Sequence, residues 1–216
     1  MNQKLESGLE RLGLAPFFSA EQISKLEEYC RCVMEFNKVY NLMKADSEDE
    51  LYVNHVLDTL AAVPHLKEFI GSGTVVGDIG SGGGCPGIPL AVAFPEANFV
   101  LVERMEKRCA FLESALKAMK LDNARVFCTK ANLVEPASFD VEVFRAFHPF
   151  DREISRLLLG MLKKGGVLCA YKAREEKILE EMNDPAVRKL IPSWKKIKLE
   201  VPFLEDHERN LVVVKK

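Results

Sequence analysis

The feature that most constrains the fold is a glycine-rich segment, GDIGSGGGCPGIPL, which spans residues 77–90. Five of the eight residues from Gly80 to Gly87 are glycine, and glycine loses more backbone entropy on folding than any other residue. Such a run is useful where the backbone needs left-handed angles or where a ligand approaches the main chain closely. A turn without a ligand needs only one or two glycines, so the segment favours a binding loop.

The segments around this loop alternate between strand and helix patterns. Strands are expected at residues 74–79, 98–103, 124–130, 139–147 and 167–172, and helices at 88–94, 105–121, 152–164 and 174–182. Two further strand patterns, at 195–203 and 209–216, lie too close together for a crossover helix and are expected to pair antiparallel. The alternation predicts an α/β protein with a doubly wound parallel sheet that ends in an antiparallel hairpin.

The first 70 residues have helical patterns throughout. Ser19 and Gln22 have the spacing of a capping box, and the apolar residues after them recur at three- and four-residue steps. A second helical pattern covers residues 48–66. We therefore expect a helical N-terminal region over residues 1–70, packed on an α/β domain over residues 71–216.

Composition excludes several classes of protein. No apolar run approaches the roughly 18 residues of a membrane span, and the charged N-terminus lacks a secretory apolar stretch. A cytoplasmic monomer without membrane contact is therefore the expectation. The six cysteines show neither a C-x-x-C pair nor zinc-ligand spacing, so reduced thiols and no metal site are expected. Residues 104–174 carry an excess of basic side chains, which fits a bound polyanion or a solvated helical face.

The glycine loop lies at a strand–helix turn, where doubly wound sheets bind nucleotide-like ligands. No G-K-[S/T] sequence follows, which excludes a Walker phosphate loop. A dinucleotide fingerprint fits Gly82, Gly84 and Gly87. However, Pro86 and Pro89 would then interrupt the helix start that holds a pyrophosphate.

A better frame is an acidic residue followed by alternating glycines: Asp78, Gly80, Gly82 and Gly84. This pattern resembles the first motif of class I S-adenosylmethionine (AdoMet) methyltransferases, a Rossmann-like fold whose sheet also ends in an antiparallel strand pair. AdoMet carries a positive sulfonium and no phosphate, so it favours carboxylates and open backbone. Glu103 ends the second expected strand, where a carboxylate can bind both ribose hydroxyls in AdoMet and NAD enzymes alike.

Four stretches together resemble the RsmG/GidB family, bacterial enzymes that methylate a guanine N7 in the small-subunit ribosomal RNA. The stretches are FNKVYNLM (36–43) followed by HVLDTL (55–60), DIGSGGGCPGIPLAVAFP (78–95), FRAF (144–147) and HERNLVVVKK (207–216). The resemblance covers the chain from about residue 30 to its end. It implies an AdoMet-dependent methyltransferase whose substrate is 16S rRNA of the small ribosomal subunit.

The resemblance also implies roles for particular residues. Main-chain atoms of Gly80 and Cys85 would line the cofactor. Ala131 and Asn132 would lie beside the adenine, although Asn132 stands where the family commonly has an acidic residue. Arg145 would face the methionine end of the cofactor and the mouth of the substrate site, where it positions the reactants.

Three more side chains are candidates for substrate contact. His55 and Asp58 are three residues apart on an expected helix and share a face, which fits either the mouth of the site or a surface or interdomain pair. Lys172 ends an expected strand at the ligand edge of the sheet, where it contacts RNA phosphate or remains solvated.

The resemblance leads to a simple mechanism, because guanine N7 keeps an unprotonated lone pair at neutral pH. Methyl transfer to it needs no general acid or base, so none is expected. The alternatives are a class I methyltransferase for a small molecule or a protein, a nicotinamide-dependent oxidoreductase, and a binding module without a cofactor. The prolines of the loop and the C-terminal hairpin favour AdoMet over a nicotinamide cofactor.

Overall fold

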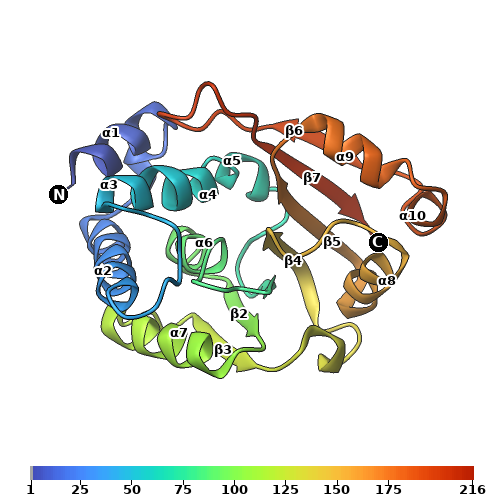
Figure 1. Ribbon diagram of the computed structural model, residues 1–216, viewed down its shortest axis with the longest axis horizontal. Helices are drawn as coiled ribbons and strands as arrows, with labels where there is room; N and C mark the ends of the chain where they lie inside the picture. The colour runs from blue at the N-terminus through green and yellow to red at the C-terminus, as the bar shows by residue number, and fades with distance from the viewer. Residues whose placement is uncertain (1) are drawn as a thin grey trace.

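The computed structural model describes residues 2–216, which form a seven-stranded sheet covered by helices on both faces (Figure 1). The strands are β1 Val75–Ile79, β2 Asn98–Glu103, β3 Ala124–Cys128, β4 Phe139–Arg145, β5 Leu162–Lys172, β6 Lys195–Lys198 and β7 Asn210–Lys215. Their spatial order is β3-β2-β1-β4-β5-β7-β6. Strands β1 to β5 are parallel, and β7 runs antiparallel between β5 and β6. The predicted α/β sheet with a C-terminal antiparallel pair is confirmed.

Helices from different parts of the chain cover the two faces of the sheet. They are α1 Gln3–Arg11, α2 Ala20–Asn37, α3 Glu48–Leu51, α4 Asp58–Leu60, α5 Val63–Leu66, α6 Gly87–Ala93, α7 Glu106–Met119, α8 Arg152–Met161, α9 Glu175–Met182 and α10 Pro185–Leu190, with short 3-10 turns η1 Ala15–Phe17 and η3 Ala131–Leu133. Helices α1 to α7 share one buried apolar cluster with one face of the sheet. Helices α8 to α10 share a second cluster with the other face.

The N-terminal helices begin where the sequence predicts. Ser19 Oγ accepts the N–H of Gln22 at 3.2 Å, and the Gln22 side chain accepts the N–H of Ser19 at 2.9 Å, which confirms the capping box of α2. The apolar core is continuous between residues 2–70 and the sheet. The domain boundary at residue 70 stays a prediction, and Met1 lies outside the described residues.

The helical pattern at residues 48–66 folds as several joined segments. A π-helical stretch, η2 Tyr52–Leu57, connects α3 to α4 and contains His55. π-Helical turns are rare in proteins, and many of those that occur lie at functional sites. This stretch packs against α1, and its Asn54 carbonyl and His55 ring contact Arg145 at the carboxyl end of β4.

The structure corrects the predictions that one helix continues to residue 164 and that the next strand begins at residue 167. Helix α8 ends at Met161, and β5 already begins at Leu162. The reason is that Leu162 pairs with Phe139 of β4, with a register shift after that pair. Strand β4 also ends earlier than predicted, because Ala146 has a left-handed φ of 52°. Helix α10 was not predicted.

Buried Glu142 on β4 leads to a stability prediction. Its side chain is inaccessible to solvent, and neither carboxylate oxygen has a hydrogen-bond partner among residues 2–216. Burial raises the pKa of Glu142 well above its ordinary value of 4.5. As pH rises above 4.5 the unfolded chain releases this proton and the folded chain keeps it, so the free energy of unfolding falls by about 1.4 kcal/mol per pH unit.

Replacement of Glu142 by glutamine removes this titration from both states. The Glu142→Gln variant is therefore expected to match wild type near pH 4 and to become progressively more stable than wild type as the pH rises above 4.5, as measured by urea denaturation. Glu113→Gln, on the exposed face of α7, is the control and should change little. A pH-independent difference between Glu142→Gln and wild type would contradict the assignment.

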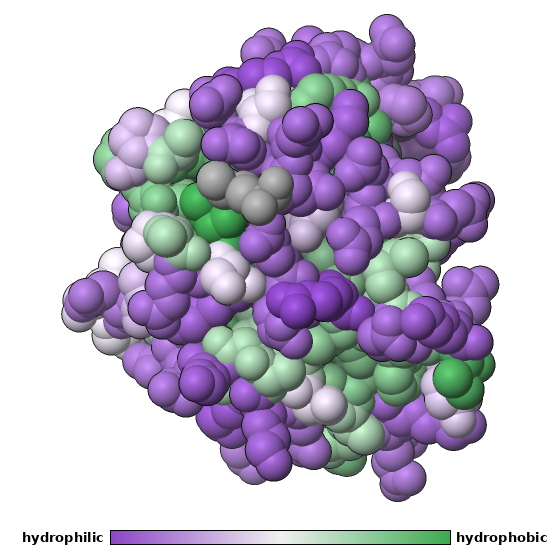
Figure 2. All heavy atoms as spheres, turned by 90° about the vertical axis from the view of Figure 1, so that its left-hand side faces the viewer, coloured by the Kyte–Doolittle hydropathy of each residue, from purple (hydrophilic) through white to green (hydrophobic). Residues whose placement is uncertain are grey.

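The outer surface has no single dominant apolar area on the side that bears α2 and α7. Figure 2 shows this side, which is largely hydrophilic with several smaller apolar patches. Among residues 2–216, no helix has both the length and the apolar character that crossing a lipid bilayer requires.

Candidate cofactor and substrate sites

The order of the parallel strands changes direction between β1 and β4. Doubly wound sheets bind ligands at this switch point, beyond the carboxyl ends of the strands. The glycine loop follows β1, Glu103 ends β2, and Arg145 ends β4. The fold therefore brings these three sequence candidates to one edge of the sheet.

The glycine loop has the backbone that the preferred frame requires. Gly80, Gly82 and Gly84 have φ values of 73°, 59° and 100°, in the left-handed region that favours glycine. The dinucleotide frame uses Gly87 instead of Gly80. Gly87 does not have a left-handed φ, and a side chain is excluded there because an added Cβ would collide with Asp78. The backbone geometry thus favours the frame of an acidic residue followed by alternating glycines over the dinucleotide fingerprint.

Asp78 braces this loop from inside the protein. Its buried carboxylate accepts the hydroxyl of Ser81 at 2.6 Å and the N–H of Gly87 at 3.0 Å. Burial raises the pKa of Asp78 to about 6, although both hydrogen bonds lower it. Cys85 is also buried, and its sulfur lies 3.2 Å from the hydroxyl of Tyr29. Neither residue lines the cavities described below, so their contact with a cofactor stays a prediction.

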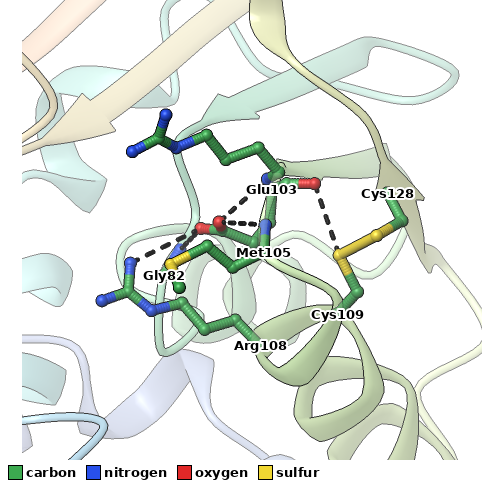
Figure 3. Close-up of a disulfide and its surroundings, with 7 residues drawn as sticks. Gly82, Glu103, Met105, Arg108, Cys109 and Cys128 are labelled. Carbon is green, nitrogen blue, oxygen red and sulfur yellow. Dashed lines mark hydrogen bonds and ion pairs between the residues drawn. A yellow bond between two sulfur atoms is a disulfide. The ribbon is translucent and has the colours of Figure 1, made fainter.

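Glu103 connects β2 to the glycine loop (Figure 3). One carboxylate oxygen accepts the N–H groups of Arg104 and Met105 at 2.8 and 2.9 Å, and the other accepts the N–H of Gly82 at 2.9 Å. Arg108 lies 3.9 Å from the second oxygen. The buried carboxylate is therefore held in place by the main chain at the end of β2 and the start of α7.

Two adjacent cavities open at this edge of the sheet. The first, of about 360 Å³, is lined by predicted cofactor residues Gly80, Glu103, Ala131 and Asn132. The second, of about 570 Å³, is lined by His55, Asp58, Arg145 and Lys172. Residues 146–148 line both cavities and form the wall between them. Four of the cofactor candidates therefore line the first cavity, whereas Arg145, a candidate for both cofactor and substrate, lines the second, and Gly82 lines neither.

Arg145 is the centre of a polar network in the second cavity. Its guanidinium donates to the Asp58 carboxylate at 2.8 Å, to the Asn54 carbonyl at 3.1 Å and to His55 Nδ1 at 2.7 Å. The other oxygen of Asp58 accepts Nε–H of Arg209 at 2.9 Å. Asp58 is buried, and its two oxygens pair with two arginines at once. The predicted shared face of His55 and Asp58 is the face that holds Arg145.

His55 acts as a hydrogen-bond acceptor in this network. Burial, and then the positive charge of Arg145, lower the pKa of His55 to about 4. The ring is therefore neutral near pH 7, with Nδ1 accepting from Arg145. Nε2–H is then left to donate to the Lys44 carbonyl, 3.3 Å away.

Lys172 does not present a free charge to the cavity. Its ammonium pairs with Glu181 at 2.6 Å and lies 4.9 Å from the ring centre of Phe150. It also lies 3.5 Å from the carbonyl of His148. The lysine is a paired residue of the cavity wall, and a role in binding phosphate stays a prediction.

The family is decided by comparison with known proteins. The family model described as rRNA small subunit methyltransferase G, or GidB, matches residues 22–212. This chain belongs to that family. A ribosomal RNA small subunit methyltransferase G from Treponema denticola is 32% identical over the whole of this chain and 94% of its own length. The protein of that name from Laribacter hongkongensis is 36% identical over 98% of this chain and 97% of its own length.

Solved structures confirm the fold of this GidB family member. TYW2 from Pyrococcus horikoshii, solved in complex with MeSAdo, has a TM-score of 0.59 at 13% identity and covers 82% of this chain and 65% of that one. The tRNA (m1A58) methyltransferase TrmI from Aquifex aeolicus has a TM-score of 0.55 at 15% identity, over 73% and 68% of the two chains. The predicted class I methyltransferase architecture is confirmed.

Several residues of the site were not assigned a role from the sequence. Arg209 lies 151 positions from Asp58 in the chain, although it belongs to one of the stretches that identify the GidB family. His148, which has no recognisable partner pattern in the sequence, lines both cavities. Tyr29 donates its hydroxyl to the Gly83 carbonyl at 2.7 Å and thereby holds the glycine loop. No local pattern marks Tyr29, because it is one of the apolar residues along α2.

The prediction that all cysteines are reduced is wrong for one pair. Cys109 at the start of α7 and Cys128 at the end of β3 form a disulfide (Figure 3). A sequence separation of 19 residues does not reveal this pairing. It arises because β3 is parallel to β2 and returns beside the helix that follows β2. The other four cysteines are free, as predicted.

Proposed function

We propose that the chain transfers the methyl group of AdoMet to N7 of a guanine in 16S rRNA of the small ribosomal subunit. The observation that carries the proposal is the pair of adjoining cavities separated by residues 146–148, with Glu103 in one and Arg145 in the other. Family membership supports the substrate class, since the relatives are named as ribosomal RNA small subunit methyltransferases. The TYW2 structures in complex with AdoMet and MeSAdo support the cofactor.

The residues of the smaller cavity fit AdoMet. An added Cβ at Gly82 would meet no atom closer than 3.8 Å, so the main chain of the loop is open on that side. Glu103 Oε2 accepts one hydrogen bond within the protein and retains a lone pair for a ribose hydroxyl. Ala131 and Asn132 would lie beside the adenine, where the Asn132 amide oxygen can accept from the amino group. Gly80, Cys85 and Asp78 would complete the cofactor site around and behind the loop.

AdoMet supplies a methyl group on an electrophilic sulfonium, and the chain aligns it with the nucleophile. Orientation of this kind supplies roughly 7–11 kcal/mol in favourable cases. Arg145 serves as the positioning group, through the methionine carboxylate or guanine O6. His55 is neutral and accepts from Arg145, so the guanidinium keeps a fixed orientation without a proton transfer. N7 already carries a lone pair, and no residue of the chain needs to act as a base.

Basic residues next to the cofactor cavity suit an RNA substrate. Arg104, Arg108 and Lys130 line that cavity, and the expected excess of basic side chains lies in this part of the chain. Positive side chains beside the site favour binding of a phosphate backbone. A guanine N7 is reached most readily in a single-stranded loop, since RNA-binding proteins splay such bases outward. We propose a cytoplasmic monomer that needs no metal ion for this reaction.

Mass mapping of methylated guanines in 16S rRNA tests the proposal. RNA from cells that lack the gene should lose one N7-methylguanine, and purified protein with labelled AdoMet should restore it on small subunits or free RNA. Thermal shifts with AdoMet and with NADH check the cofactor, because a ligand stabilises the state that binds it. Stabilisation by NADH alone would favour an oxidoreductase, and labelling of a protein or small molecule would favour another methyltransferase.

A further inference from the structure

The Cys109–Cys128 disulfide lies directly beside the residue proposed to bind the ribose. Cys128 is the register partner of Glu103 in the pairing of β2 with β3. Cys109 Sγ lies 3.3 Å from the main-chain carbonyl of Glu103. Figure 3 shows the Glu103 carboxylate directed toward Gly82 and its carbonyl directed toward Cys109. The bond therefore joins α7 to β3 around Glu103.

The same bond joins the two walls of the cofactor cavity. One wall consists of Glu103, Arg104 and Arg108, from the end of β2 and the start of α7. The opposite wall consists of residues 129–132, which follow Cys128 directly. A hydrogen bond of 2.8 Å from the N–H of Thr129 to the Glu103 carbonyl also joins the walls. β3 is an edge strand and, within the described residues, pairs only with β2.

The two cysteines differ in their exposure to solvent. Cys128 is an exposed residue of the edge strand, whereas Cys109 is buried with 3% of its surface exposed. An attacking thiolate must reach a sulfur of the bond, and Cys128 is the cysteine that is exposed to solvent. Cys109 belongs to the first turn of α7, and a position at a helix N-terminus favours a thiolate as the leaving group.

We propose that Cys109–Cys128 is a thiol–disulfide exchange site for dithiol reductants and that it adjusts the affinity for AdoMet. One thiolate of the reductant attacks Cys128 Sγ, the bond between the two cysteines breaks, and Cys109 leaves as a thiolate and takes up a proton. The second thiol of the reductant then displaces Cys128. Two electrons and two protons pass to the cysteine pair, and the reductant becomes a disulfide.

The change in affinity follows from pre-organisation and rests on the proposed function. When the cysteines are oxidised, the bond holds the two walls of the cavity in place before the cofactor binds. When they are reduced, the walls become ordered only on binding, and the entropy cost of that ordering weakens the affinity. Reduction is therefore expected to raise the Kd for AdoMet roughly threefold to tenfold, as for the ordering of one side chain. The site is distinct from the polar network of Arg145, which the bond does not contact.

The exchange site is tested first by counting thiols. The chain has six cysteines, of which four are free in the structure. Alkylation after denaturation should label four cysteines in protein treated with oxidised glutathione and six after treatment with dithiothreitol. In single variants, Cys109→Ser should leave an exposed Cys128 that forms a mixed disulfide rapidly, and Cys128→Ser a buried Cys109 that reacts slowly. Six labelled cysteines in both conditions would overturn the proposal.

Calorimetric titration with AdoMet then tests the effect on binding. Oxidised wild type should bind threefold to tenfold more tightly than reduced wild type, as estimated above. The Cys109→Ser/Cys128→Ser variant keeps the other four cysteines, and it should match reduced wild type in both conditions. Equal affinity of oxidised and reduced wild type would overturn the adjustment. Absence of AdoMet binding in every sample would overturn the proposed function together with the adjustment, while the thiol count still decides the exchange site.

Discussion

Replacement of Arg145 by alanine is expected to reduce methyl transfer to 16S rRNA by a factor on the order of 100 or more, because misplacement of reactants by about 1 Å has effects of that size. The guanidinium lies at the end of β4, in the wall of the larger cavity, and is oriented by Asp58, His55 and the Asn54 carbonyl. Arg145 directly precedes residues 146–148, which line both cavities.

The fold is expected to survive this substitution. Asp58 would lose one partner but would keep Arg209, whose Nε lies 2.9 Å from the other carboxylate oxygen. The buried carboxylate is then still paired, which avoids the penalty of an isolated buried charge. His55 is already neutral, so it does not need the arginine for charge compensation. The thermal midpoint of Arg145→Ala should therefore stay within a few degrees of wild type, which corresponds to roughly 1 kcal/mol or less.

Two control variants separate positioning from charge. Arg145→Lys keeps a positive charge beside Asp58 but loses the planar fork, so it should recover only a small part of the activity. Arg188→Ala removes an exposed arginine of α10 and should leave the rate unchanged. A raised Kd for AdoMet in Arg145→Ala would indicate contact with the methionine carboxylate, whereas an unchanged Kd would indicate contact with the guanine. Wild-type turnover by Arg145→Ala would remove this residue from the site.

The parts of the site that the sequence predicts are those encoded within short segments. Gly80, Gly82 and Gly84 are recognisable because only glycine takes a left-handed φ freely, and the spacing of the three reflects one turn. Glu103 is recognisable because it is the last residue of the strand that follows the loop and its helix. That strand is expected to lie next to the first one in the sheet. The alternation of strands and helices then places both at the same edge.

The remaining parts depend on contacts between distant segments. Arg209 and Asp58 meet because β7 returns beside β5 as an antiparallel strand, and no sequence rule gives that register. Cys109 and Cys128 likewise meet because β3 pairs with β2 and so lies beside the helix that follows β2. The start of β5 was misread because Gly165 and Gly166 resemble a turn, although pairing of Leu162 with Phe139 extends the strand across them.

The wall between the cavities combines strain and close packing. Ala146 has a φ of 52°, which costs a residue with a Cβ about 1–2 kcal/mol. The conformation directs Phe147 over the loop, where its ring atom lies 2.5 Å from the position of an added Cβ at Gly80. Gly80 is thus required by the wall of the substrate cavity as well as by its own backbone. Strained backbone of this kind is concentrated at functional sites.

Gly82 provides the second large effect. Its φ is 59°, and an added Cβ would meet no atom closer than 3.8 Å, so a side chain there fills open space rather than the protein core. The proposed function puts AdoMet against this part of the loop. Gly82→Val is therefore expected to abolish measurable binding of AdoMet, with a Kd raised on the order of 100-fold or more, since the steric conflict involves backbone that cannot move away cheaply.

The backbone strain of this variant has a matched control. Gly73 has a φ of 76°, an added Cβ there would meet no atom within 4 Å, and it precedes β1 at the opposite end of that strand from the loop. Gly73→Val should lose a similar amount of stability, about 1–2 kcal/mol or somewhat more for a β-branched residue, yet bind AdoMet as wild type does. Calorimetry on both variants separates the two causes. Wild-type affinity in Gly82→Val would show that the cofactor does not lie against this loop, and equal losses of affinity in both variants would attribute the effect to strain alone.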